Sequence, residues 1–185
     1  MTEIVIQEKG FQGKFQLTLT NVDCFRIDKI NPHKRLTNCH LKDIDVCWLE
    51  PSTQVLYLME FKDYANPHFL ANSSIDEKLE ELIAKATDVL LILASVWSNS
   101  KKGQEYKREI PESCYVIPRK IKFFFVFKLI TTQIQNDIPA ITTTLRNRLQ
   151  GRAALFDIDV ANDVVIIDLQ QASQIFPLVW ITTTP

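Results

Sequence analysis

Three charged residues lie at the ends of two neighbouring apolar segments, where they could bind a metal ion. Asp45 lies near the start of segment 44–50, and Glu60 and Lys62 close segment 55–62. Mg²⁺ binds through one or two carboxylates together with water and phosphate oxygens, and a nearby lysine can orient a water molecule during phosphoryl transfer. The alternative interpretation is a solvated strand end with an ordinary pair between an aspartate and a lysine, because acid-x-lysine triplets are common by chance.

The two segments are predicted to form a β-hairpin. Both are rich in residues that favour strands, and the four residues that separate them, Pro51 to Gln54, are of types that favour turns. We expect Glu50 and Val55 to close the hairpin as a pair. In an antiparallel pair of strands, one pair of facing residues determines all the others, so this turn also determines which charged residues face each other.

In this register, four charged side chains lie on one side of the hairpin. Asp45 faces Glu60, and Asp43 faces Lys62, because side chains alternate between the two faces of a sheet. Two carboxylates that face each other on neighbouring strands repel and destabilise the pair. A divalent cation between Asp45 and Glu60 would remove this repulsion, which favours a metal site over a purely structural role. The opposite side is predicted to be a core face, formed by Ile44, Val46, Trp48, Met59 and Phe61.

A helix and a buried strand are expected after the hairpin. Ser74 and Glu77 form a capping box, which marks the start of a helix. Apolar residues then recur at spacings of three and four as far as Trp97, as they do in an amphipathic helix. The short apolar run 123–127 is typical of a strand that is buried on both faces. Strand, helix and strand together predict a β-α-β crossover with two parallel strands.

The remaining segments complete an α/β fold with a mixed β-sheet and flanking helices. The 185 residues are enough for one sizeable core, so a single domain over residues 1–185 is expected. The further elements predicted in chain order are strands at 15–19 and 24–30, a loop at 31–40, a helix at 138–150 between a capping Asp137 and Gly151, and a hairpin of strands 156–160 and 164–169.

The order of these features resembles the core of the PD-(D/E)XK nuclease superfamily. The resemblance rests on Asp45, the hairpin, the motif from Glu60 to Lys62, and the helix and buried strand that follow, and it covers roughly residues 40–130. It implies a restriction-endonuclease-like core and a magnesium-dependent phosphodiesterase. In that enzyme Asp45 and Glu60 hold Mg²⁺ or Mn²⁺, and Lys62 assists the attacking water. The expected partner and substrate is DNA, whose phosphodiester bonds the protein would hydrolyse.

The chain also departs from the pattern of this superfamily. Its members usually have a helix before the first of these strands and a proline before the first catalytic acid, whereas no helical pattern precedes residue 44 and Ile44 occupies the position of the proline. The alternative function is therefore a non-catalytic module on the same fold that binds nucleic acid or a protein. Asp43 and Lys85 are candidate accessory residues: Asp43 as a further acid, and Lys85 as a phosphate contact or as part of a solvated helix face.

A basic stretch precedes and includes the buried strand. Between residues 101 and 128 there are eight lysines and arginines against three glutamates. Lys101, Lys102, Lys107 and Arg108 are the residues expected to contact a nucleic-acid backbone. The alternative is a solvated loop without a ligand.

The overall composition limits the class of protein. The 21 basic and 22 acidic residues give a net charge of −1, which argues against a highly basic nucleic-acid coat protein and against a polybasic membrane binder. The four cysteines contain no Cys-x-x-Cys pair, so free thiols are expected. Charged residues interrupt the few apolar residues at the start of the sequence, which shows no signal-like apolar core. This predicts a cytoplasmic protein without a membrane partner. The oligomeric state stays open, with a homodimer among the alternatives.

Overall fold

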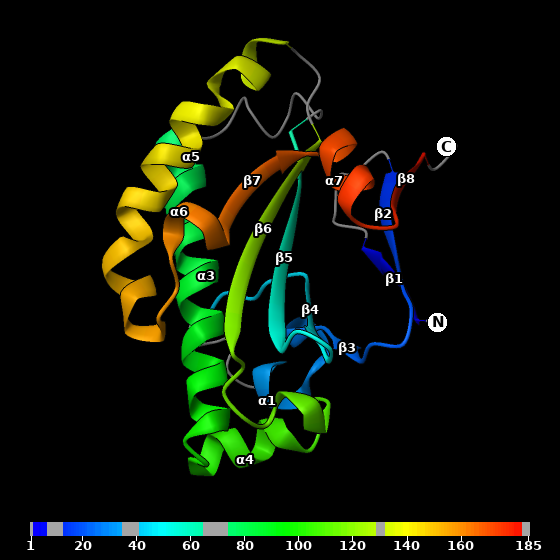
Figure 1. The fold of residues 1–185 in the computed structure, drawn as a ribbon, viewed down its shortest axis with the longest axis vertical. Helices are drawn as coiled ribbons and strands as arrows, with labels where there is room; N and C mark the ends of the chain where they lie inside the picture. The colour runs from blue at the N-terminus through cyan, green and yellow to red at the C-terminus, as the bar shows by residue number, and fades with distance from the viewer. Residues whose placement is uncertain (1, 7–12, 35–40, 65–73, 129–131, 183–185) are drawn as a thin grey trace.

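Two β-sheets and a layer of helices make up the protein (Figure 1). The computed structural model describes residues 2–6, 13–34, 41–64, 74–128 and 132–182. A five-stranded sheet occupies the centre. Its two long helices cover one face, and a three-stranded sheet covers the other face (Figure 1). The candidate residues of the hairpin therefore belong to the central layer, where side chains on both faces are buried.

The central sheet is mixed, as expected. Its strand order is β3-β4-β5-β6-β7, with antiparallel pairing from β3 to β5 and parallel pairing from β5 to β7. Glu50 pairs with Val55 and Val46 pairs with Met59, so the predicted hairpin register is confirmed. The strands are β3 (Cys24–Phe25), β4 (Val46–Glu50), β5 (Val55–Asp63), β6 (Lys120–Lys128) and β7 (Val164–Asp168).

Strand β5 carries buried apolar side chains on both of its faces, which explains its position inside the sheet. Leu56 and Leu58 belong to the core beneath the helices, whereas Met59 and Phe61 belong to the core shared with the smaller sheet. Glu60 follows the same alternation and is directed to the helix side. Ile44 was expected opposite the helices but packs in the helix-side core, because β4 begins only at Val46 and the strand alternation does not extend back to residue 44.

The predicted crossover is confirmed. Helix α3 (Ile75–Trp97) begins at the capping box of Ser74 and Glu77, and it connects β5 to the parallel strand β6. Its buried residues recur along the face that packs on the sheet. Two short elements then lead into β6, namely α4 (Lys101–Lys107) and the 3₁₀ helix η3 (Glu112–Cys114), where the sequence indicated only irregular structure.

A second crossover replaces the predicted hairpin at 156–169. Helix α5 (Thr132–Ala153) lies between β6 and β7, and β7 runs parallel to β6, so no hairpin forms. The residues before β7 form a 3₁₀ turn and a short helix, η4 (Ala154–Phe156) and α6 (Val160–Asp163). Two neighbouring parallel strands need a crossover connection, and α5 provides it between β6 and β7. Helix α5 also extends beyond both predicted ends, so that Asp137 and Gly151 lie inside it.

The two chain ends meet in the smaller sheet. Strand β2 (Gly13–Leu19), which the alternation predicted, pairs with both β1 (Thr2–Ile6) and β8 (Leu178–Thr182). Helix α7 (Leu169–Ile175) leads into β8. The predicted strand at 24–30 is shorter than expected, since η1 (Ile27–Lys29) follows β3, and helix α1 (Asn31–Lys34) begins the segment that was expected to be a loop.

Gly103 lets α4 pack closely against the end of α3. A Cβ atom at Gly103 would lie 1.8 Å from the carbonyl oxygen of Ser95, whereas a Cβ atom at Gly151 in α5 would meet no atom within 4 Å. We expect Gly103→Ala to lower the free energy of unfolding by about 1–3 kcal/mol, the usual cost of overpacking. Gly151→Ala should instead raise it, by up to about 1 kcal/mol, because alanine favours helix. Urea denaturation of both variants tests the contact, and equal effects would contradict it.

Candidate active site

A buried carboxylate on β5 lies at the centre of the candidate site. Glu60 has no solvent exposure, and its Oε1 atom lies 3.0 Å from Nζ of Lys62 and 2.6 Å from Nζ of Lys85. Lys62 is two residues further along β5, on the same face, and Lys85 comes from α3. Both lysines are themselves buried. Three charged groups thus meet between the sheet and the crossover helix.

Glu81 of α3 extends this cluster toward solvent. Its Oε1 atom accepts a hydrogen bond from Nζ of Lys62 at 2.9 Å, so Lys62 is held between two carboxylates. Burial alone would raise the pKa of Glu81, but the ammonium groups of Lys62 and Lys85 keep it below its usual value. Glu81 lies one turn before Lys85 on the same face of α3, a spacing suited to an ion pair within the helix. In the structure, each of the two residues instead forms an ion pair with a residue of β5: Glu81 with Lys62, and Lys85 with Glu60.

Lys85 also forms an ion pair with a carboxylate of the cluster, that of Glu60. Burial would lower the pKa of Lys85, yet the Glu60 carboxylate raises it above the ordinary value for lysine. Among the described residues its ion pair is with Glu60, whereas Lys62 has both Glu60 and Glu81. The structure therefore places this candidate accessory residue directly at the site.

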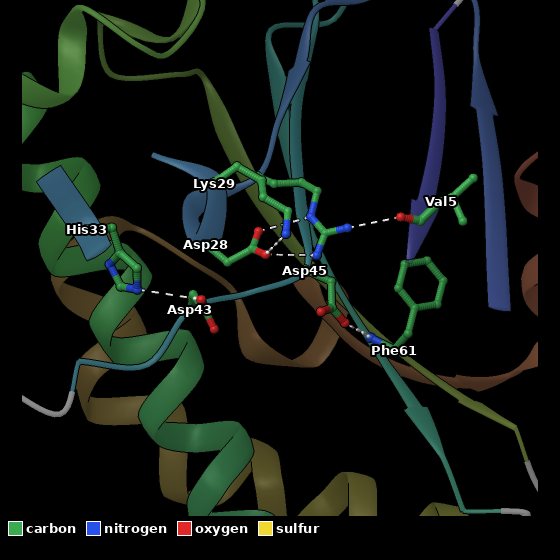
Figure 2. Close-up of polar contacts among 8 residues, drawn as sticks. Val5, Asp28, Lys29, His33, Asp43, Asp45 and Phe61 are labelled. Carbon is green, nitrogen blue, oxygen red and sulfur yellow. Dashed lines mark hydrogen bonds and ion pairs between the residues drawn. The ribbon is translucent and has the colours of Figure 1, made fainter. Parts of the chain in front are cut away.

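Asp45 contacts β5 at Phe61, the residue after Glu60, and is held differently from the prediction. Its Oδ2 atom accepts a hydrogen bond from the backbone N–H of Phe61 at 2.7 Å, and Figure 2 shows the carboxylate directed at that part of β5. Asp45 is one residue before the start of β4, so it lies outside the ladder that pairs β4 with β5. It also interacts electrostatically with Lys85. The two carboxylates are thus near the same ammonium group.

Asp43 does not face Lys62, and that prediction is wrong. Asp43 lies 3.5 Å from Nε2 of the buried His33, a contact drawn in Figure 2. Burial would raise the pKa of Asp43, but the hydrogen bond from His33 and the charge of Lys85 lower it. The reason is that the chain before β4 turns away from the sheet toward α3, where the backbone N–H of Lys42 donates to Asp88. Sequence reasoning gave His33 no role, since nothing in its spacing indicated this contact.

The four basic residues expected to contact nucleic acid lie away from the cluster around Glu60. They belong to α4 and its end, beside the N-terminal end of β6, whereas Lys62 is near the C-terminal end of β5. Val55, which pairs with Lys120, lies seven steps along β5 from Lys62, or about 23 Å at 3.3 Å per step. Lys102 pairs with Glu105, and Lys107 donates to Asn99. The remaining two, Lys101 and Arg108, line a hollow of about 680 Å³ with α1.

The donor set at Glu60 and Asp45 fits Mg²⁺ or Mn²⁺. In the part of the chain that the structure describes, no three or more His, Cys, Asp or Glu residues are arranged to hold a metal ion. Mg²⁺, however, commonly takes only one or two carboxylates and completes its shell with water and phosphate oxygens. The Oε2 atom of Glu60 is buried and receives no hydrogen bond from the described residues. This atom and the Asp45 carboxylate, which also accepts the Phe61 N–H, are the oxygens that would hold such an ion.

No protein-family model matches the chain, and neither curated proteins nor solved structures give a match. Among the described residues, no helix has both the length and the apolar character needed to cross a membrane.

Proposed function

We propose that this protein is a magnesium-dependent nuclease that hydrolyses phosphodiester bonds of DNA. The observation that carries the proposal is the fully buried Glu60, at which two buried lysines are directed, with the Asp45 carboxylate hydrogen-bonded to the next residue of β5. Removing charged groups from water costs several kcal/mol per ion, and a buried ion pair often contributes little to stability. A cluster of this kind is more readily explained by chemistry than by folding, since perturbed and buried charges concentrate at functional sites.

Each residue of the cluster has a distinct role in the proposed reaction. Asp45 and Glu60 would hold the metal ion, which, when bound, supplies a Lewis acid for the phosphate and lowers the pKa of a bound water. Lys62 would orient the attacking water and offset negative charge. Glu81 is a positioning residue, because its carboxylate holds the Lys62 ammonium at 2.9 Å.

The arrangement of elements also supports the proposal. Asp45 comes from the bend that leads into β4, Glu60 and Lys62 come from β5, and α3 and the parallel strand β6 follow. This is the order that the resemblance to the PD-(D/E)XK nucleases implied.

Three conservative variants test the reaction. Asp45→Asn, Glu60→Gln and Lys62→Met should each reduce magnesium-dependent cleavage at least about 100-fold, because a positioned acid, base or metal contact contributes that much to a hydrolytic rate. Lys29→Met is the matched control, since Lys29 forms an exposed ion pair with Asp28 at 2.9 Å. Cleavage is measured on single-stranded, duplex and branched DNA and on RNA, with Mg²⁺ and with Mn²⁺, and circular dichroism confirms that each variant is folded.

Two outcomes would contradict the proposal. Wild-type protein that cleaves none of these substrates would favour the alternative, a non-catalytic module that binds nucleic acid or a protein. Cleavage that persists in all three variants would mean that the activity comes from another site or from a contaminant.

A further inference from the structure

The ion pair between Lys85 and Glu60 suggests how the pairing inside the candidate metal site changes when a metal ion binds. We propose that Lys85 is an exchangeable counter-ion of Glu60, which a divalent cation displaces from the carboxylate. This inference rests on the proposed metal site and adds a step to it: the site changes its internal pairing when the cation binds. Three features of the described residues carry it, namely the contacts at Glu60, the charge balance around them, and the alternative partners of Lys85.

The contacts at Glu60 leave little room for a third cation. Both ammonium groups approach the same oxygen, Oε1, and the shorter of the two contacts, at 2.6 Å, is the one with Lys85. The second oxygen, Oε2, is buried without a hydrogen-bond donor among the described residues. A divalent cation on this carboxylate would therefore lie within a few ångströms of two like charges, in a site that water does not screen.

The two lysines differ in how firmly they are held. Lys62 keeps a second carboxylate, Glu81, at 2.9 Å when its pair with Glu60 is weakened. Lys85 has its ion pair only with Glu60 in the described part of the chain. The repulsion from an arriving cation is therefore relieved most readily by moving Lys85.

Lys85 has other negative groups to which its ammonium can turn. Glu81 lies one helical turn before it on the same face of α3, and both Glu81 and Asp43 already interact with it electrostatically. The side chains of Glu81 and Asp43 are 32% and 33% exposed, so the displaced ammonium would move toward solvent. The exchange thus replaces one internal cation by a metal ion without leaving a buried charge unpaired.

Lysine footprinting of the 185-residue chain tests the exchange directly. The protein is acylated briefly with an amine-reactive ester, with chelator or with Mn²⁺, and the modification of each lysine is measured by mass spectrometry. Mn²⁺ should raise the modification of Lys85 severalfold, and it should leave Lys62 protected by Glu81. Exposed Lys29 is the internal control and should react equally in both conditions. In Glu60→Gln, Lys85 should react strongly with or without Mn²⁺.

Titration calorimetry with Mn²⁺ on the same samples separates the possible failures. If Mn²⁺ binds and Lys85 stays protected, the exchange is refuted while the metal site stands. If Mn²⁺ does not bind, the metal site and the exchange both fall.

A variant of the lysine itself gives an independent measurement. Lys85→Met should bind Mn²⁺ severalfold more tightly than wild type, because the competing cation is gone, whereas Lys29→Met should bind it as wild type does. Unchanged or weaker binding by Lys85→Met would overturn the exchange.

Discussion

Replacing Glu60 by alanine should lower the free energy of unfolding by about 3–5 kcal/mol, the range seen when one partner of a buried ion pair is removed. The variant leaves the ammonium group of Lys85 buried without its carboxylate, and Lys62 loses one of its two carboxylates while it keeps Glu81. Asp28→Ala is the matched control, because Asp28 also pairs with two cations, Arg26 at 3.0 Å and Lys29 at 2.9 Å, but is partly exposed. Figure 2 shows the Asp28 contacts.

The control should lose about 1 kcal/mol or less, as is usual for ion pairs near the surface. Urea unfolding of both variants gives the comparison. A double variant tests the cause: Glu60→Leu with Lys85→Met should be more stable than Glu60→Leu alone, because the apolar pair no longer buries an unpaired charge. A loss at Glu60 no larger than that at Asp28, or a double variant less stable than the single one, would contradict a buried pair at this position.

Asp45→Asn should abolish the stabilisation that Mn²⁺ gives to the protein. A bound ligand stabilises the folded state by about 2.7 kcal/mol when its free concentration is a hundredfold above its dissociation constant. In chelator, we expect the variant to be about 1 kcal/mol less stable than wild type, because a neutral amide oxygen accepts the hydrogen bond from Phe61 less strongly than a carboxylate does.

This second effect reverses what the hairpin register alone implied. With Asp45 simply opposed to Glu60, the loss of a charge should have relieved repulsion and kept or raised the stability. In the structure, Lys85 interacts with both carboxylates, and the Phe61 N–H stabilises Asp45.

Thermal melts of wild type and Asp45→Asn, each with chelator and with Mn²⁺, measure both effects. Asp168→Asn is the control, because the Asp168 carboxylate also accepts a backbone hydrogen bond at 2.7 Å, from Gln171, at a position in β7. Because Asp168 caps the start of α7 and asparagine caps helices about as well as aspartate does, this variant should lose little stability and keep the full response to Mn²⁺. Equal metal responses in wild type and Asp45→Asn would remove Asp45 from the proposed metal site.

The amino-acid sequence by itself determined the elements whose signals are local. The four-residue turn from Pro51 to Gln54 was enough to predict the register of β4 and β5, because the pairing of a hairpin follows from its turn. The capping box at Ser74 and the periodic apolar residues after it marked α3, and the apolar run in β6 marked a buried strand. These signals together predicted the parallel crossover.

Other features depended on contacts between segments that are far apart in the chain, and the local pattern did not reveal them. Apolar residues around 156–169 fitted a hairpin as well as a turn and a parallel strand, and only pairing with β6 distinguished the two. Likewise, β8 pairs with β2 across most of the chain length. A strand pattern reports which side chains are buried, and it does not report which strand lies beside it.

The candidate site divides in the same way. Strand alternation placed Glu60 and Lys62 on one face, and this followed from the sequence alone. The partners of these residues were decided by tertiary structure: Lys85 and Glu81 reach β5 because α3 packs across it, Asp45 turns onto the Phe61 N–H, and Asp43 pairs with His33. Charged side chains pair with whatever the fold brings within a few ångströms, and spacing along the chain gives that distance only within one helix or one hairpin.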